Sequence, residues 1–255
     1  MALERERRAG VEILRLDRPE ARNAIDPDTS RAIEAALDEI DADPEVRCVV
    51  ITGTGPVFCA GADLKVIAAG GGADIMTRRG GFAGLAWREL AKPTIAAVNG
   101  PALAGGFEIA LACDLVVAAD TAVFGLPEVQ RGLLASAGGP VRLAQRVPLA
   151  VALELAVLGE AITAARAAEL GLVNRVVPAD RVLDEALVLA DRVVANSPAA
   201  VRGVRELVLG AADTDRAGGW ELNRRIMRQV AASPDGIEGA RAFVDKRAPV
   251  WADPE

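Results

Sequence analysis

The chain has 255 residues, of which 51% are hydrophobic, so it can bury a sizeable core and is globular rather than disordered. Its 36 acidic and 29 basic residues give a net charge of −7, which disfavours sequence-independent binding to DNA or RNA because that binding requires clustered cations. Histidine and tyrosine are absent, which excludes Ser-His-Asp and Cys-His catalysis, the Tyr/Lys pair of short-chain dehydrogenases and the commonest metal ligand.

The first half of the chain is predicted to alternate strands with helices. Apolar runs predict four strands, at residues 11–17, 46–52, 94–99 and 115–119. A helix is predicted over 28–41, because Ile33, Ala36, Leu37 and Ile40 fall on one face, and a second helix over 82–90. The Gly-rich stretch 68–81 between them is expected to be mobile. This order of elements indicates an α/β layered fold.

The C-terminal third is predicted to be helical. From about residue 149 onward the patterns are those of helices, interrupted by one short strand at 172–177. Pro198 stands where a helix would begin, because proline is favoured at the first helical position. We therefore expect a core of residues 1–195 and a C-terminal helical module of residues 196–255.

The three cysteines, Cys48, Cys59 and Cys113, have mostly apolar neighbours and match no zinc-binding spacing. They are predicted to be buried, reduced thiols. The N-terminal "MALERERRAG" lacks the apolar region of a secretion signal, and no apolar run approaches the ~20 residues that span a bilayer. We expect a cytoplasmic protein that binds neither membrane nor nucleic acid.

The segment "VVITGTGPVF" partly resembles a dinucleotide-binding turn, since Gly53 and Gly55 follow a predicted strand. Phe58 stands where that fingerprint requires Gly or Ala, and Pro56 interrupts the turn. Dinucleotide binding is therefore not predicted.

Two other loops share one design, in which a strand leads through small residues into a short helix. One holds Ala60-Gly61-Ala62-Asp63 and the other Ala104-Gly105-Gly106. Each alone is explained by a turn with a helix cap. Together, their free backbone N–H groups would stabilise an oxyanion if both pointed at one place, and glycine would let a ligand approach closely.

Two glutamates accompany these loops. Glu108 follows the second loop directly, and Glu128 lies in "FGLPEVQRG". Alone, Glu108 could simply complement a helix dipole, and Glu128 could be a solvated loop residue. A buried pair of carboxylates is, however, the usual equipment for acid–base catalysis without histidine, because burial and repulsion keep one protonated and one ionised.

Five segments together resemble the crotonase superfamily, the enoyl-CoA hydratase/isomerase fold. They are "LDRPEARNAID" (16–26), "CAGADLK" (59–65), "KPTIAAVNGPALAGGFEIALACDLVVAAD" (92–120), "FGLPEVQRGL" (124–133) and "AFVDKRAPVW" (242–251). The resemblance covers essentially the whole chain. It implies an α/β fold, a spiral of ββα units, with a C-terminal helical region that forms trimers or dimers of trimers. It is more specific for the superfamily than for the reaction, because one fold hosts many reactions.

The resemblance also implies the chemistry. The backbone N–H groups of Ala62 and Gly105 would hold the thioester oxygen of an acyl-CoA substrate as it becomes an enolate. Glu108 and Glu128 match the two catalytic glutamates of hydratases, which add water to a 2-enoyl-CoA. Isomerases of the same fold generally keep only one. No cofactor or metal is implied, because CoA is part of the substrate.

Further residues are implied to bind CoA or substrate. They are Ala21, Arg22, Ala24, Ala60, Ala62, Asp63, Lys65 and Lys246, the last matching a lysine that reaches the CoA of a neighbouring subunit. Both lysines are equally explained as solvated surface cations. Ser136 replaces a glycine that many hydratases have near the catalytic water, so its hydroxyl would hold that water or contact a polar substrate.

Four functions remain open at this point. The favoured one is an enoyl-CoA hydratase. "GGFAGL", "GGFEIALACD" and "FVDKRAPVW" also resemble carnitinyl-CoA dehydratases, although a chain without tyrosine offers little for an aromatic cage around a quaternary ammonium group. An enoyl-CoA isomerase or a non-catalytic acyl-CoA binder would use the same fold.

Overall fold

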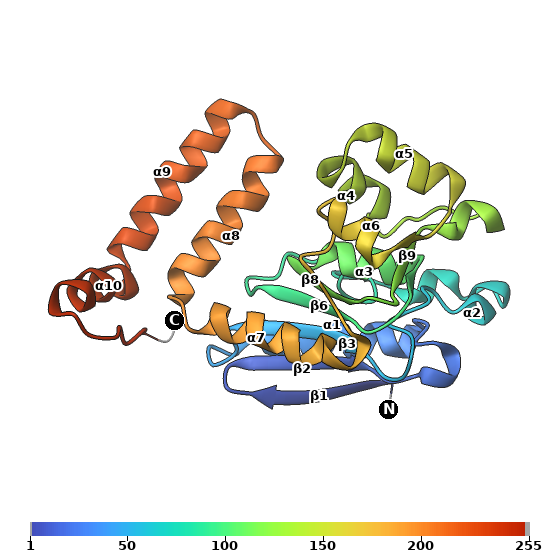
Figure 1. Ribbon diagram of the computed structural model, residues 1–255, viewed down its shortest axis with the longest axis horizontal. Coiled ribbons are helices and arrows are strands. Elements are labelled where there is room, and N and C mark those ends of the chain that lie inside the picture. The colour runs from blue at the N-terminus through green and yellow to red at the C-terminus, as the bar shows by residue number, and fades with distance from the viewer. Residues whose placement is uncertain (1, 253–255) are drawn as a thin grey trace.

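The centre of the protein is a six-stranded sheet (Figure 1) in the order β1-β2-β3-β6-β8-β11. The structure is a computed structural model that describes residues 2–252. β1 and β2 pair antiparallel, and every other neighbouring pair is parallel. The strands are β1 (Leu3–Arg8), β2 (Val11–Leu16), β3 (Cys48–Gly53), β6 (Thr94–Val98), β8 (Leu115–Ala119) and β11 (Arg175–Val177).

The middle strands of this sheet form the core. Every residue of β3 and β6 is buried, which explains why their sequences are continuous apolar runs rather than alternating ones. Helix α7 (Val182–Val194) packs against β3, β6 and β8, and α1 (Pro27–Ala42) contacts β1 and β2. Asp26 caps α1 by accepting a 2.8 Å hydrogen bond from the Thr29 N–H.

A second layer holds the smaller elements. β10 (Ile162–Thr163), β9 (Val123–Gly125) and β7 (Ala102–Leu103) form a three-stranded sheet, and β4 (Met76–Thr77) pairs with β5 (Gly81–Phe82) as a hairpin. The helices of this layer are α2 (Leu64–Ala68), α3 (Gly105–Ala112), α4 (Gly139–Arg146), α5 (Leu149–Leu158) and α6 (Ala164–Glu169). β7 leads into α3 through the single residue Ala104, so α3 begins next to the small sheet.

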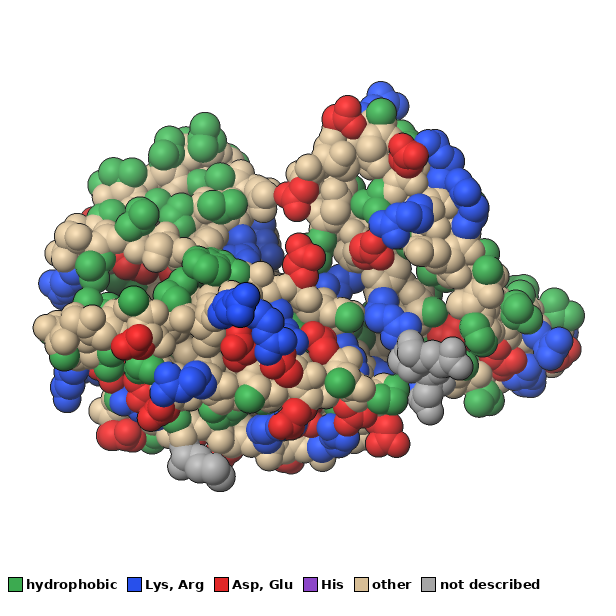
Figure 2. Space-filling view, turned by 180° about the vertical axis from the view of Figure 1, so that it is seen from behind, with side chains coloured by type: hydrophobic (Ala, Val, Ile, Leu, Met, Phe, Trp, Pro, Cys, Tyr) green, Lys and Arg blue, Asp and Glu red, His purple; other side chains and the backbone are tan. Residues whose placement is uncertain are grey.

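Three helices extend away from this body as an arm (Figure 1): α8 (Pro198–Ala212), α9 (Arg216–Ala232) and α10 (Pro234–Asp245). Ser197 caps α8, and its hydroxyl donates a 2.7 Å hydrogen bond to the buried carboxylate of Asp235, which ties the start of α10 to the start of α8. Figure 2 shows hydrophobic side chains exposed over α5 and over α10. Phe243 on α10 is 85% exposed.

Most predicted elements are confirmed. The strands at 11–17, 46–52, 94–99 and 115–119 are β2, β3, β6 and β8, each within two residues of its predicted ends, and the predicted apolar face of the first helix is the buried face of α1. Pro198 is the first residue of α8, as expected. The predicted boundary between residues 195 and 196 lies between α7 and α8, and residues 253–255 of the predicted C-terminal module lie outside the described residues.

The helix predicted over 82–90 is wrong. Residues 83–87 form successive turns instead, because Gly81, Ala83 and Gly84 all have positive φ angles that a right-handed helix excludes. Gly84 lies against α1, where a Cβ would be 2.6 Å from the Ser30 carbonyl oxygen. Packing against α1 therefore overrides the local helical pattern. The preceding stretch 68–81 contains a short 3₁₀ helix at Gly72–Ile75 and the β4–β5 hairpin.

The three cysteines are buried and unpaired, as predicted. Burial raises the pKa of each thiol to about 12. Among residues 2–252, no helix combines the length and the apolar character needed to cross a bilayer.

Candidate active site

The two small-residue loops meet at Gly61. The Leu103 N–H donates a 3.0 Å hydrogen bond to the Cys59 carbonyl, and Cys59 forms a β-bridge with Ala102. A Cβ at Gly61 would lie 2.7 Å from the Ala104 Cβ and 2.9 Å from the Gly105 nitrogen. With a φ of 92°, Gly61 also adopts a conformation that other residues rarely take. Only glycine lets the loops come this close.

Among residues 2–252, the backbone N–H groups of Ala62 and Gly105, where the loops meet, have no hydrogen-bond acceptor. Ile25 forms a β-bridge with Ala62. In this bridge the Ile25 N–H donates to the Gly61 carbonyl, and the Ile25 carbonyl accepts from the Asp63 N–H. The Ala62 N–H therefore points away from that bridge, since adjacent groups of an extended chain point to opposite sides. Gly105 is the first residue of α3, so its N–H has no partner within the helix. The predicted oxyanion donors thus lie on loops in direct contact.

The glycines of α3 are required by close packing. A Cβ at Gly105 would collide with the Phe82 ring, and one at Gly106 would collide with the Cys59 carbonyl. In the first turn of α3, Phe107 packs against Phe124 of β9 with ring centroids 5.3 Å apart. These contacts fix the direction of the helix and hence the position of the next residue, Glu108.

Glu108 is buried, with only 3% of its surface exposed. Its Oε1 accepts a 2.8 Å hydrogen bond from the Gly139 N–H, and a Cβ at Gly139 would lie 2.9 Å from the Glu108 Cγ. Burial raises the pKa of Glu108, while hydrogen bonds from the backbones of Gly139 and Ala137 and the charge of Arg142 oppose the rise. The carboxyl group is thus held in one place and is harder to ionise than in water.

Glu128 lies in a 3₁₀ helix at Pro127–Arg131. Burial, with a further contribution from the Glu108 charge, raises the pKa of Glu128 to about 7. Its Oε2 is buried, and within residues 2–252 nothing donates a hydrogen bond to it. A buried oxygen without a partner is costly, so this one is set to bind a group from outside the chain. The Glu108 charge is one of the causes that raise the pKa of Glu128, so the two carboxyl groups influence each other's ionisation.

The predicted CoA-binding residues are brought together by a second set of contacts. The Ala60 N–H donates to the Arg22 carbonyl over 3.1 Å, which places the loop 21–24 against the loop 60–65. Asp63 caps α2 through the Lys65 N–H, and its other oxygen accepts a 3.1 Å bond from Arg18. Lys65 is exposed beside it. The predicted CoA residues Ala21, Arg22, Ala24, Ala60, Ala62, Asp63 and Lys65 thus share one side of the molecule.

Two predicted residues stand apart. Ser136 is exposed between buried Ala135 and Ala137, three residues before Gly139, so it is near the glutamates along the chain but faces outward in a single subunit. Lys246 caps the C-terminal end of α10, at the opposite end of the molecule from α2 (Figure 1). Within one chain it does not reach the loops that hold the other predicted residues.

Sequence reasoning missed several residues that build the site. Asn23, 1% exposed, donates from its side chain to the carbonyls of Thr54 and Val57 and so shapes the first loop. Arg142 donates to the carbonyls of Ala137 and Ala86 and places a positive charge near Glu108. Asn23 stands within the segment 16–26 that carries the family resemblance, and this is the signal that could have found it. Arg142 gave no signal, since it looks like an ordinary helical cation.

Within the described part of the chain, no cluster of three or more acidic or cysteine side chains could hold a metal ion.

Comparison with known proteins identifies the family of this chain. Residues 6–254 match the profile of the family described as enoyl-CoA hydratase/isomerase. The carnitinyl-CoA dehydratase of Proteus mirabilis is 41% identical over 92% of both chains. The probable enoyl-CoA hydratase echA8 of Mycobacterium bovis is 41% identical over 97% of this chain and 95% of its own. The crystal structure of an enoyl-CoA hydratase from Mycobacterium tuberculosis is 40% identical over 99% of both chains, with a TM-score of 0.94.

Proposed function

Because this chain belongs to the enoyl-CoA hydratase/isomerase family, we propose that it is an enoyl-CoA hydratase, which adds water reversibly to the double bond of 2-enoyl-CoA thioesters. The observation that carries the proposal is the pairing of Glu128, with an unpartnered buried oxygen and a pKa of about 7, with the buried Glu108. An isomerase needs only one such group. A hydratase needs two, one to take a proton from water and one to give a proton to carbon.

The reaction follows from this geometry. The thioester oxygen accepts hydrogen bonds from the N–H groups of Ala62 and Gly105, which stabilise the negative charge that develops there; loss of one such donor typically costs about 10²–10³-fold in kcat. A water molecule lies between the glutamates. As its oxygen bonds to the β-carbon, one carboxylate takes its proton, the π bond breaks, and the other carboxyl group delivers a proton to the α-carbon. Because the pair is coupled, the two roles are not divided further.

CoA is proposed to lie along the joined loops 21–24 and 60–65. The backbones of Ala21, Arg22, Ala24, Ala60 and Ala62, together with Asp63, would surround the adenine end, and Lys65 would pair with phosphate. The contact between the two loops supports this placement, since it puts all these groups on one side. Ser136 would approach the acyl group. The substrate itself brings the CoA group, so no separate cofactor is proposed.

A homotrimer, or a dimer of trimers, is proposed as the working assembly. Hydrophobic side chains are exposed along the arm and over α5 (Figure 2), including Val208 at 66%, Phe243 at 85% and Leu149 at 65%. Patches of this kind mark surfaces that other subunits cover. In such an assembly Lys246 would reach the CoA phosphates of a neighbouring subunit. The buried free thiols fit a reducing compartment, the cytoplasm.

Carnitinyl-CoA dehydratase is the second candidate, because a relative of that name is as similar as the enoyl-CoA hydratases. It would use the same two glutamates on an acyl group that carries a quaternary ammonium. Trp87, 55% exposed, has its ring beside Gly81 and would offer an aromatic face to such a cation.

The test follows the absorbance of the conjugated enoyl thioester in crotonyl-CoA. Wild-type protein should remove it rapidly, Glu108→Gln and Glu128→Gln should lose nearly all of this activity, and Glu154→Gln, an exposed control on α5, should keep it. Full activity of Glu108→Gln on the preferred substrate would contradict the hydratase mechanism. Dehydration of carnitinyl-CoA, measured in parallel and faster than crotonyl-CoA hydration, would favour the second candidate. Binding of acyl-CoA without turnover would show a binder.

A further inference from the structure

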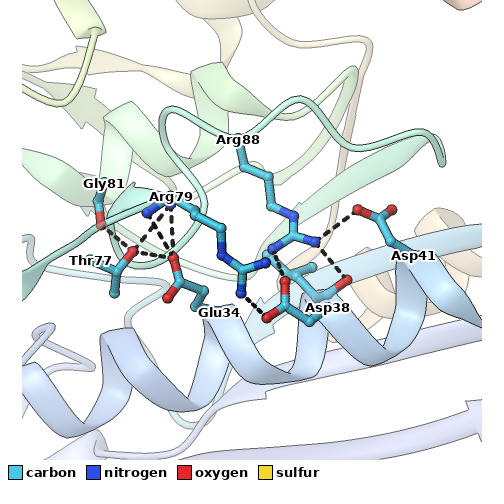
Figure 3. Close-up of polar contacts among 9 residues, drawn as sticks. Glu34, Asp38, Asp41, Thr77, Arg79, Gly81 and Arg88 are labelled. Atoms are coloured by element: carbon cyan, nitrogen blue, oxygen red, sulfur yellow. Dashed lines mark hydrogen bonds and ion pairs between the residues drawn. The ribbon is translucent and has the colours of Figure 1, made fainter.

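A single carboxylate on α1 holds the turn of the β4–β5 hairpin. Oε1 of Glu34 accepts hydrogen bonds from the Thr77 hydroxyl at 2.6 Å, the Gly80 N–H at 2.9 Å and the Arg79 N–H at 3.3 Å (Figure 3). These donors span the whole turn between the two strands. Burial would raise the pKa of Glu34, but these hydrogen bonds and the Arg79 charge lower it, so the group stays ionised at neutral pH.

Two more carboxylates on the same face of α1 hold the rest of this segment. Asp38 pairs with Arg79 and, at 2.6 Å, with Arg88, and Asp41 pairs with Arg88 at 2.8 Å (Figure 3). Glu34, Asp38 and Asp41 follow one another at helical spacing, so one face of α1 is directed at residues 77–88. We call these three residues the α1 carboxylate row.

The segment held by this row is under conformational constraint. Ala83 has a φ of 55°, a strained conformation for a residue other than glycine, which persists only where the surroundings impose it. Gly84 lies so close to α1 that a Cβ would be 2.7 Å from the Glu34 Cβ. The path of residues 81–84 therefore depends on contact with α1.

This segment reaches the candidate oxyanion hole through Phe82. Phe82 follows the turn directly, is 5% exposed, and pairs with Met76 across the hairpin. Its ring lies against Gly105, whose missing side chain leaves the space that the ring fills. The chain of contacts thus runs from Glu34 through the turn and Phe82 to Gly105.

We propose that Glu34 is a positioning residue for the oxyanion hole, an inference that rests on the hydratase function proposed above. It fixes the hairpin turn, the turn fixes the Phe82 ring, and the ring fixes the place of the Gly105 N–H. A displacement of about 1 Å in such a group can cost about 10²-fold in rate, so a carboxylate distant from the substrate is still able to govern turnover.

The first experiment compares Glu34→Ala and Glu34→Gln with Glu39→Gln, a matched control on the same helix whose side chain pairs with Arg5 at the surface. We expect Glu34→Ala to lower kcat on crotonyl-CoA by about 10-fold or more, with the Kd for CoA unchanged, because the loops 21–24 and 60–65 are untouched. Glu34→Gln should lose less, because its amide oxygen still accepts from Thr77 and Gly80. Glu39→Gln should match wild type.

The second experiment measures the order of the segment 76–88 directly, independently of catalytic activity. Hydrogen exchange of the peptide 76–88 should be faster in Glu34→Ala than in wild type, because the Arg79 and Gly80 amides lose their acceptor, and unchanged in Glu39→Gln. Thr77→Val removes one donor from the turn and leaves the helix intact, so it gives a milder variant if Glu34→Ala does not fold. It should lower kcat severalfold.

The outcomes separate the two proposals. If wild-type protein and Glu39→Gln both fail to hydrate crotonyl-CoA and other enoyl thioesters, the proposed function is wrong. If wild type is active and the folded Glu34→Ala and Thr77→Val variants keep its kcat, the positioning proposal is wrong, whatever the exchange rates are. A loss confined to thermal stability, with kcat intact, would likewise overturn it.

Discussion

The body and the arm of this protein bury their hydrophobic residues to very different extents. In the body, the strands β3 and β6 are buried at every position, and α1 packs Leu37 and Ile40 at 0% exposure. In the arm, among the described residues, the buried aliphatic side chains of α8–α10 are Pro198, Ile226 and Ala242. The exposed ones there include Val204, Val208, Leu209, Trp220, Met227, Ile237, Phe243 and Val244.

This difference separates two roles. The body buries enough apolar surface within one chain to fix the loops and the glutamates of the candidate site. The arm is held to itself by the packing of α8 on α9 and by the Ser197–Asp235 hydrogen bond, but its outer faces lack a covering within the chain. We propose that the body carries the chemistry and that the arm, together with the exposed face of α5, carries the assembly; the predictions below test this division.

The largest effect is expected from a single glutamate in the body. Glu108→Gln should lower kcat on crotonyl-CoA by about 10²–10⁴-fold, the usual worth of a general acid or base, and leave the sedimentation coefficient unchanged. The matched change in the arm is Glu206→Gln, which removes an exposed carboxylate that pairs with Arg225. It should leave kcat at the wild-type value. Comparable losses in both variants would refute the division of roles.

Shortening a hydrophobic side chain should lower the free energy of unfolding when the side chain lies in the body, but not when it lies in the arm. Leu37→Ala, at a fully buried position of α1, should lower the free energy of unfolding by about 2–5 kcal/mol in urea titrations. Phe243→Ala, at an 85% exposed position of α10, removes as much apolar surface without leaving a cavity in the chain. It should instead lower the fraction of assembled protein in sedimentation at low concentration. An unchanged assembly would mean that α10 is not part of the subunit interface.

The pH dependence of stability should differ in sign between the two regions. In the body, the pKa of Glu128 is raised to about 7, so the folded state holds a proton that the unfolded chain releases near its ordinary pKa of 4.5. This contribution is present at low pH and is lost as pH rises from about 4.5 to 7, by about 1–3 kcal/mol. In the arm, hydrogen bonds from Arg247 and the Val250 N–H lower the pKa of Glu238 to about 2. Its contribution is present above pH 4.5 and is lost as pH falls toward 2.

Urea titrations at several pH values would measure both contributions. Glu128→Gln should flatten the decline between pH 5 and 8, and Glu238→Gln should leave that decline intact while reducing the loss of stability in acid. A wild-type curve that rises between pH 5 and 7, and is unaltered in Glu128→Gln, would contradict a raised pKa at this glutamate.

The smallest effect concerns the one predicted site residue that lies in the arm. Lys246→Ala should raise the KM for crotonyl-CoA by about two- to fivefold, because an exposed ion pair contributes at most about 1 kcal/mol. Lys65→Ala in the body should have a similar effect. Only the Lys246 effect should disappear in the Phe243→Ala background, since this lysine is proposed to act on the CoA of a neighbouring subunit. Persistence of the effect in dissociated protein would place Lys246 outside the CoA site.

The sequence allowed the regular elements and the site motifs to be predicted where local pattern and tertiary structure agree. The strand at 115–119 matches β8 at both ends, because a fully buried parallel strand is a continuous apolar run. The loops around Gly61 and Gly105 were found because close backbone approach demands small residues. The sequence points to Glu108 because a carboxylate at the start of an otherwise apolar helix is costly to bury and therefore indicates a functional role.

Other features depend on contacts between distant residues. The turns at 83–87 resemble a helix in sequence, and only the packing of Gly84 on α1 decides against it. Glu34 is an ordinary helical glutamate until the hairpin turn, more than forty residues away, donates three hydrogen bonds to it. The orientation of the arm and the place of Lys246 likewise have no signal in local pattern, because they are set by how whole elements pack.

The buried thiols have a consequence for following the body in time. Cys48 begins β3, Cys59 lies in the loop that carries the candidate oxyanion donor Ala62, and Cys113 ends α3, while the arm has no cysteine. With pKa values of about 12 and no exposed surface, these sulfurs react with an alkylating reagent only when the body opens. The order in which the three cysteines are alkylated therefore reports separately on the opening of the sheet, of the loop and of the end of α3, in the protein with its natural sequence.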